Sequence, residues 1–166
     1  PGLRPTLDRV RETLFNWLTL DLPTSRCLDL FAGTGAVGIE AASRGAPEVV
    51  LVEKDRELVS NLNQQVSRLA ASQITVIGAD ALHYLKNTTP RPFDLIFLDP
   101  PFGHNLLPPT CALLAQSGWL SANSLVYMEM ERHFAPPAFL PSHWSVTRHL
   151  MAGQLASYLI RLKPSS

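Results

Sequence analysis

The chain lacks an excess of charge of either sign, because 14 Lys and Arg balance 14 Asp and Glu among its 166 residues. Zero net charge excludes a generally basic coat for nucleic acid, although it leaves a local basic patch open. Charged residues are also few, at 17% against a usual ~25%, whereas hydrophobic residues make up 46%. This composition excludes an intrinsically disordered chain, and the length fits one domain with a substantial core.

Cysteine is scarce as well, since only Cys27 and Cys111 are present. Two cysteines cannot build a disulfide framework, and neither has the CxxC or His-spaced partner of a structural zinc site. Metal-ligand spacing is also missing from the histidines, which are His83, His104, His133, His143 and His149. We therefore expect no metal, and a reducing, cytoplasmic setting.

A run of 18 apolar residues and a signal-peptide pattern are both missing, so we expect no contact with a membrane. The chain begins at Pro1 rather than at methionine. We expect that a segment precedes Pro1 in the full protein and that this segment matters for partner binding.

What is present is an alternation of helical and strand patterns. Helical periodicity predicts helices over residues 7–20, 36–44, 55–70, 80–86 and 106–117. Short apolar runs predict strands over residues 26–31, 48–53, 73–78, 93–98, 124–130, 143–151 and 154–162. We expect an α/β, Rossmann-like, doubly wound sheet of seven strands, mostly parallel with a C-terminal antiparallel pair. Residues 1–25 would form a helical segment packed on a domain of residues 26–166.

A glycine-rich loop follows the first predicted strand, with Gly33, Gly35 and Gly38 in the G-x-G-x-x-G pattern. Glycines allow a tight turn and a close approach of a ligand to the backbone. Glu53 ends the second strand, where a carboxylate can accept hydrogen bonds from both ribose hydroxyls. Together these features indicate a nucleoside-containing cofactor, either a dinucleotide or S-adenosylmethionine.

Asp29 favours S-adenosylmethionine. It lies inside the first strand just before the glycine loop, where a dinucleotide would place its pyrophosphate and an anion would be unwelcome. The ammonium group of S-adenosylmethionine would instead be attracted to this carboxylate. After the third strand, Asp80 can cap the next helix and can also reach an adenine amine.

The most specific feature is Asp99-Pro100-Pro101-Phe102, which follows the fourth strand. Two prolines fix the backbone and remove two N–H donors, so the loop offers acceptors beside an aromatic ring. Such a surface suits an exocyclic amine on a flat base: the ring stacks while the acceptors hold the amine hydrogens and favour a pyramidal nitrogen. The protein then positions the reactants and stabilises charge that develops on nitrogen.

These residues in this order resemble the class I S-adenosylmethionine-dependent methyltransferases, and the Asp99 loop resembles that of exocyclic-amine methyltransferases. The opening phrase, residues 3–17 (LRPTLDRVRETLFNW), narrows the resemblance to the RsmD family, bacterial guanine-N2 methyltransferases of 16S ribosomal RNA. Residues 30–45 and 51–54 resemble that family as well.

The resemblance implies residue roles. The methionine part of the cofactor would lie on Asp29 and the loop from Gly33 to Gly38, the ribose on Glu53, and the adenine on Asp80 and Ala81. Other cofactor contacts are expected from Phe31, Ala32, Thr34 and Lys54. The catalytic loop would comprise Asp99 and Pro100, which accept from guanine N2, together with Pro101 and the stacking Phe102. The substrate mouth would be bordered by Arg4, Arg9 and Arg11, and His104 is a further candidate for substrate contact.

The implied substrate is 16S RNA in a small ribosomal subunit or its assembly intermediate, with one base flipped from its stack. The chain departs from the family pattern in lacking a basic, glycine-rich segment before the Arg-Pro-Thr phrase, so we expect good cofactor binding and weak RNA binding. Adenine N6, a protein glutamine amide, a nicotinamide-dependent oxidoreductase and a non-catalytic cofactor-binding protein stay open as alternatives.

Overall fold

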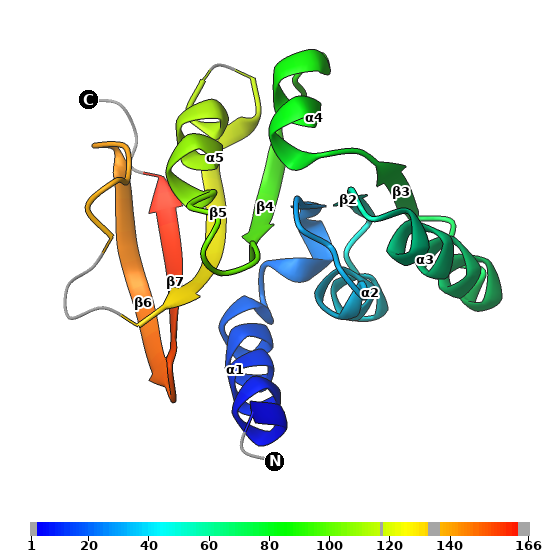
Figure 1. The fold of residues 1–166 in the computed structure, drawn as a ribbon, viewed down its shortest axis with the longest axis horizontal. Helices are drawn as coiled ribbons and strands as arrows, with labels where there is room; N and C mark the ends of the chain where they lie inside the picture. The colour runs from blue at the N-terminus through cyan, green and yellow to red at the C-terminus, as the bar shows by residue number, and fades with distance from the viewer. Residues whose placement is uncertain (1–2, 117, 133–136, 163–166) are drawn as a thin grey trace.

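The computed structural model of the chain describes residues 3–116, 118–132 and 137–162, with side chains from residue 8 onward. One seven-stranded sheet runs through it in the order β3-β2-β1-β4-β5-β7-β6 (Figure 1). The strands are β1 (Arg26–Asp29), β2 (Glu48–Glu53), β3 (Ile74–Gly78), β4 (Phe93–Leu98), β5 (Leu120–Glu131), β6 (Trp144–Ala152) and β7 (Leu155–Leu162).

The first five strands pair in parallel, whereas β7 pairs antiparallel with both β5 and β6. The doubly wound sheet and its C-terminal antiparallel pair are therefore confirmed. Among the described residues β7 is the strand nearest the C-terminus, yet it lies between β5 and β6 rather than at the edge of the sheet.

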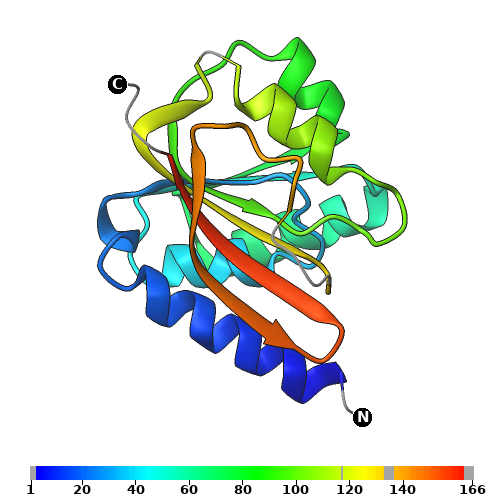
Figure 2. The same cartoon turned by 90° about the vertical axis from the view of Figure 1, so that its left-hand side faces the viewer.

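Helices cover both faces of the sheet (Figures 1 and 2). Helices α1 to α3 lie on one face, and α4 and α5 lie on the other. Their bounds are α1 (Leu3–Leu18), α2 (Ala36–Ser43), α3 (Arg56–Leu69), α4 (Ala81–Asn87) and α5 (Leu107–Leu114), with a short 3-10 turn at Leu22–Thr24.

Each face of the sheet has its own hydrophobic core. In β2, Val49 and Leu51 pack towards α1, α2 and α3, whereas Val50 and Val52 pack towards α4 and α5. This alternation follows from the two-residue period of a strand. It also explains why the central strands read as unbroken apolar runs in the sequence.

Several boundaries differ from the sequence-based expectation. Helix α1 begins at Leu3 rather than residue 7, because Pro5 falls in the first turn, where the missing N–H would lack a helical partner anyway. Strand β1 ends at Asp29, two residues early, and β5 begins at Leu120, four residues early. Helix α5 ends at Leu114, and residue 117, where it was expected to end, lies outside the described residues.

Among the described residues, no helix has the length and apolar character needed to cross a membrane. The same part of the chain contains no group of three or more His, Cys, Asp or Glu side chains that could hold a metal ion. Cys27 and Cys111 are both buried and free.

Candidate active site

Three acidic side chains gather at the carboxyl ends of β1, β4 and β5. The strand register pairs Asp29 with Phe97 and Phe97 with Tyr127. Side chains two residues apart on a strand share a face, so Asp99 and Glu129 point to the same face as Asp29. That face is the one covered by α1 and α2.

Asp29 is the most deeply buried of the three acids, with 3% of its surface exposed. The pKa of its carboxyl is raised to about 7, mainly by burial and to a smaller extent by the charges of Glu53 and Glu129. A hydrogen bond from the Phe31 N–H, at 3.3 Å from Oδ1, acts in the opposite direction. A cation placed beside Asp29 would relieve this electrostatic cost.

Asp99 is accessible to solvent along one side, yet protein atoms crowd its carboxyl. Loss of hydration is the main cause that raises the pKa of Asp99 to about 8, followed by the charge of Glu129 and then that of Asp29. The nearby Arg11 guanidinium lowers it. Solvent access makes the rise of the Asp99 pKa smaller. The direction is still upward, because three acids lie close together.

Glu129 is a site residue that the sequence analysis missed. Its side chain is 9% exposed, and the Tyr127 hydroxyl donates a hydrogen bond to its Oε1 at 2.6 Å. The Ser157 hydroxyl of β7 lies 3.1 Å from the same tyrosine oxygen. The available signal was the acid at the carboxyl end of the fifth strand, the same position that singled out Asp99 in the fourth.

The glycine loop has the geometry that its sequence predicts. Gly33 and Gly35 adopt positive φ angles of 58° and 81°, which side chains rarely adopt. A Cβ at Gly35 would collide with Leu62 of α3, and one at Gly38 would collide with Leu51 of β2. At Gly33 the space beyond the backbone is open, so a ligand can approach there.

Glu53 joins this loop to the end of β2. Its Oε1 accepts a hydrogen bond from the Gly33 N–H at 2.8 Å, and its Oε2 accepts one from the Asp55 N–H at 2.9 Å. Each carboxylate oxygen has a second lone pair, so the fixed carboxylate can still accept a further hydrogen bond.

Two adjoining pockets lie on either side of the glycine loop. One, the methionine-end pocket of about 200 Å³, contains Asp29, Gly33 and Thr34 of the expected methionine end, together with the expected cofactor contacts Phe31 and Ala32. The other, the nucleoside-end pocket of about 340 Å³, contains Glu53, Asp80 and Ala81 of the expected nucleoside end, together with the expected cofactor contact Lys54. Phe31, Gly33 and Asp99 line both pockets, so the two pockets adjoin at these residues and form one continuous site.

The structure confirms one of the two roles expected of Asp80, that of capping a helix. Its carboxylate accepts a hydrogen bond from the His83 N–H at 3.0 Å and so caps α4. The cap fixes the carboxylate at the edge of the nucleoside pocket.

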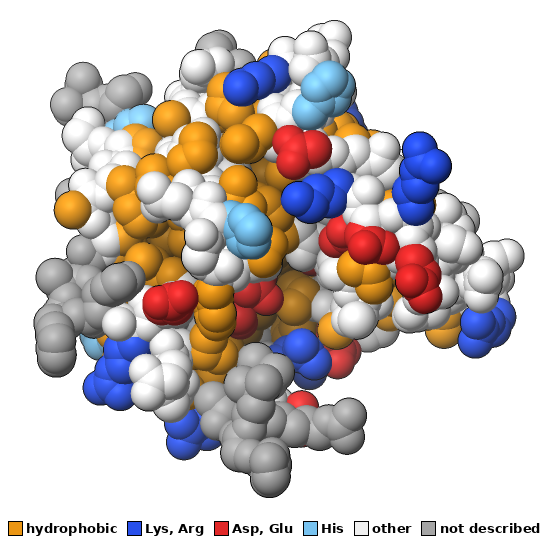
Figure 3. Space-filling model, viewed as in Figure 1, with side chains coloured by type: hydrophobic (Ala, Val, Ile, Leu, Met, Phe, Trp, Pro, Cys, Tyr) orange, Lys and Arg blue, Asp and Glu red, His pale blue; other side chains and the backbone are white. Residues whose placement is uncertain are grey.

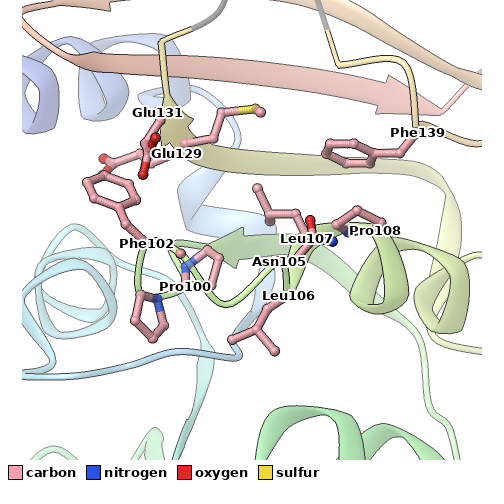
Figure 4. Close-up of a pocket in the computed structure, with 12 residues that line it drawn as sticks. Pro100, Phe102, Asn105, Leu106, Leu107, Pro108, Glu129, Glu131 and Phe139 are labelled. Carbon is pink, nitrogen blue, oxygen red and sulfur yellow. The ribbon is translucent and has the colours of Figure 1, made fainter.

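A third pocket, of about 260 Å³, opens on the outer side of the Asp99 loop (Figure 4). Pro100, Pro101 and Phe102 line it together with Glu129 and Glu131. Figure 4 shows the Phe102 ring beside the two glutamates, with Phe139 across the pocket. Phe102 is 51% exposed, which leaves its ring free to contact a flat ligand.

The candidate substrate residues on α1 do not lie together. Arg9 is exposed, whereas Arg11 lines the pocket that contains Asp29. Arg4 lies in the same helix, but its side chain and the whole of His133 lie outside the described residues. His104 is exposed in the loop after Phe102 and is not among the described residues that line the third pocket.

The face that carries the site is hollow at its centre (Figure 3). Hydrophobic and acidic side chains surround the hollow, and the Lys and Arg side chains visible there are scattered rather than joined in one patch. This distribution agrees with the zero net charge of the chain.

Fold and site together define a class I methyltransferase: a sheet of this topology with an acid before the glycine loop, a carboxylate after β2 and an Asp-Pro-Pro-Phe loop after β4. The chain belongs to the family described as Conserved hypothetical protein 95, which it matches over residues 1–161.

Relatives of the chain carry methyltransferase names. It is 44% identical over 156 residues to Ribosomal RNA small subunit methyltransferase D of Escherichia coli (strain K12), covering 94% of this chain and 78% of the relative. It is 42% identical over 160 residues to the protein of the same name from Haemophilus influenzae, covering 95% and 81%. The solved structure of the Escherichia coli protein yhhF superposes with a TM-score of 0.89 at 39% identity, covering 95% of this chain and 88% of that one.

Proposed function

We propose that this methyltransferase transfers a methyl group from S-adenosylmethionine to the exocyclic N2 amine of a guanine in small-subunit ribosomal RNA. One observation carries the proposal. Asp99 lines the methionine-end pocket and the nucleoside-end pocket, and it also begins the loop whose next residues line the third pocket. A cofactor that spans the first two pockets would therefore pass Asp99 and present its reactive centre to a ligand in the third pocket.

The residues present fit S-adenosylmethionine. The buried Asp29 carboxyl has a raised pKa and no ion-pair partner among the described residues, so it suits the ammonium group. Glu53 suits the ribose hydroxyls, and Asp80 lies at the edge of the nucleoside pocket, where it can accept from the adenine amine. When bound, this cofactor supplies a methyl group on a sulfonium, which leaves as a neutral thioether.

The Asp99 loop suits a poorly nucleophilic amine. The Asp99 carboxylate and the Pro100 carbonyl can accept the two amine hydrogens, which favours a pyramidal nitrogen with a localised lone pair. As the new N–C bond forms, the amine gains positive charge, and the neighbouring carboxylate stabilises that charge. Asp99 then accepts the proton that the nitrogen releases, so no covalent intermediate with the protein is required.

Glu129 and Glu131 favour guanine over adenine. Guanine carries donors at both N1 and N2 on one edge, whereas adenine carries an acceptor at N1. The third pocket has acidic side chains on one side of Phe102 (Figure 4). Acceptors there suit an edge made of donors and repel one that contains an acceptor.

The RNA part of the proposal rests on the relatives, whose names specify small-subunit ribosomal RNA. A base within folded RNA must leave its stack to reach the third pocket, and the exposed Phe102 ring can stack on it. Small ribosomal subunits and their assembly intermediates are then the partners, and the cytoplasm is the place of action.

The test is transfer of a tritiated methyl group from S-adenosylmethionine to small ribosomal subunits that lack their native methylations, followed by nucleoside analysis. We expect N2-methylguanosine in 16S RNA, formed about 10²–10³ times more slowly by the Asp99→Asn variant. N6-methyladenosine or a labelled ribosomal protein would refute the guanine assignment and favour one of the alternatives. Absence of any transfer, with S-adenosylhomocysteine binding intact, would refute catalysis on this substrate.

A further inference from the structure

Arg11 stands out among the side chains that the proposed chemistry leaves without a role. Its Nε lies buried on α1 and has no hydrogen-bond partner among the described residues. A buried donor on a charged group costs free energy unless it finds an acceptor. This cost points to an acceptor that a bound ligand brings.

The surroundings of Arg11 identify the kind of acceptor. Arg11 lines the pocket that contains Asp29 and the Gly33 loop. Among the described residues lining that pocket, Arg11 is the only basic one, beside three acids: Asp29, Asp99 and Glu129. Its charge lowers the pKa of Asp99, but no described acid lies close enough to form an ion pair with it.

A second group of donors faces the same pocket. Helix α2 begins at Ala36 after Gly35, and no side chain caps its first turn. Ala36 and Val37 both line the pocket, so the first turn of α2, whose N–H groups have no intrahelical partner, borders the same pocket as Arg11. An anion there would meet a helix N-terminus and a half-buried cation together.

We propose that Arg11 binds the carboxylate of the amino-acid end of the cofactor, while Asp29 binds the ammonium group of the same end. This inference rests on the proposed use of S-adenosylmethionine. The amino-acid end carries one positive and one negative group, and in a pocket with three acids its carboxylate requires a cation. An arginine guanidinium matches a carboxylate in charge and in planar geometry.

The role proposed for Arg11 therefore differs from the one that the family resemblance implied, which was to border the substrate mouth. Arg9, two residues earlier on α1, is exposed and remains suited to RNA phosphates. The two arginines would act on different partners, one on the cofactor and one on the RNA.

The test compares binding of two ligands by calorimetry: S-adenosylhomocysteine and its decarboxylated analogue, which keeps the amine but lacks the carboxylate. For the wild-type chain we expect the analogue to bind roughly 10-fold to 100-fold more weakly. Arg11→Gln should weaken S-adenosylhomocysteine by a similar factor and leave the analogue unchanged. Arg11→Lys should restore part of the loss, and Arg68→Gln, which removes an exposed arginine of α3, should change neither.

Equal weakening of both ligands by Arg11→Gln would show a structural role and overturn the proposal. Unchanged S-adenosylhomocysteine affinity, with RNA affinity lost, would assign Arg11 to the substrate instead. The comparison of ligands on the wild-type chain needs no variant, so equal binding of the two ligands there would overturn the proposal even if Arg11→Gln fails to fold. A wild-type chain that binds neither ligand would overturn the cofactor assignment itself, which is a different failure.

Discussion

The Gly33 N–H donates a hydrogen bond of 2.8 Å to Oε1 of Glu53, across 20 residues of sequence. The bond links the loop after β1 to the end of the neighbouring strand β2. The two sequence features that indicated a nucleoside cofactor are therefore parts of one hydrogen-bonded unit. Glu53 is held by backbone donors on both oxygens and needs no rearrangement before it accepts a ribose hydroxyl.

Replacing Glu53 tests that unit. In Glu53→Gln the amide offers one acceptor oxygen in place of two, so its NH2 group faces one of the two backbone donors. We expect S-adenosylhomocysteine to bind roughly 10-fold to 100-fold more weakly, since a hydrogen bond to a charged group contributes about 1.5–3 kcal/mol. Calorimetric titration measures the loss, and Glu57→Gln on the exposed first turn of α3 is the matched control. An unchanged midpoint for Glu53→Gln would remove its assigned role.

Asp99→Asn separates catalysis from cofactor binding. The amide keeps the shape of the side chain but loses the negative charge that stabilises the reacting amine. We expect kcat to fall by about 10²–10³, the size seen when one preorganised electrostatic group is removed. S-adenosylhomocysteine should still bind within a few-fold of wild type. Single-turnover methyl transfer gives the rate, and a rate near that of wild type would contradict the role.

Phe102→Ala tests stacking on the substrate base. Because stacking of a base on an aromatic ring contributes about 1–3 kcal/mol, RNA affinity should fall by roughly 5-fold to 150-fold. Leu69→Ala removes another exposed hydrophobic side chain, on α3, and should leave RNA affinity unchanged. Filter binding measures both variants, and equal affinities would argue against stacking.

Asp29→Asn should weaken cofactor binding and raise the free energy of unfolding at neutral and alkaline pH. In the folded chain Asp29 keeps its proton up to a pKa of about 7, against 3.8 for the unfolded chain. Between these values the folded state binds more protons, so the free energy of unfolding falls as pH rises, and it stays low above pH 7. Asparagine does not titrate and so avoids this loss.

We expect the Asp29→Asn variant to match wild type near pH 4 and to melt several degrees higher at pH 8, since 1 kcal/mol corresponds to about 2–4 °C at this chain length. Melting curves across pH give the comparison. The same variant should lose S-adenosylhomocysteine affinity, because the ammonium group loses its counter-charge. A variant that melts lower than wild type at pH 8 would contradict the electrostatic argument.

The sequence was sufficient for most of the architecture. Apolar runs alternating with helical patterns predicted the sheet, and the short link at Gly153 predicted the antiparallel pair. Because parallel strands end at one edge, Asp29, Glu53, Asp80 and Asp99 could be assigned to one site before their distances were known. These predictions depended on local patterns and on topology alone.

Two features required the structure. Glu129 was not predicted as a site residue, because its neighbours in sequence form no motif. Its position in the site depends on the pairing of β4 with β5. The helical pattern of α1 places Arg11 beside the apolar stripe of that helix. The burial of its Nε depends on how α1 packs in the folded chain. Register and helix packing are set by distant contacts, which a local pattern does not contain.

The position of β7 has a consequence for how the chain folds during its synthesis. This strand follows β5 and β6 in the sequence but lies between them in the sheet, and its Ser157 contacts the tyrosine that holds Glu129. A growing polypeptide therefore emerges with its glycine loop first. Its three acids, Asp29, Asp99 and Glu129, are fixed in place only after β7 has inserted. Because such distant pairings form late and slowly, the site should become active only after β7 has paired with β5.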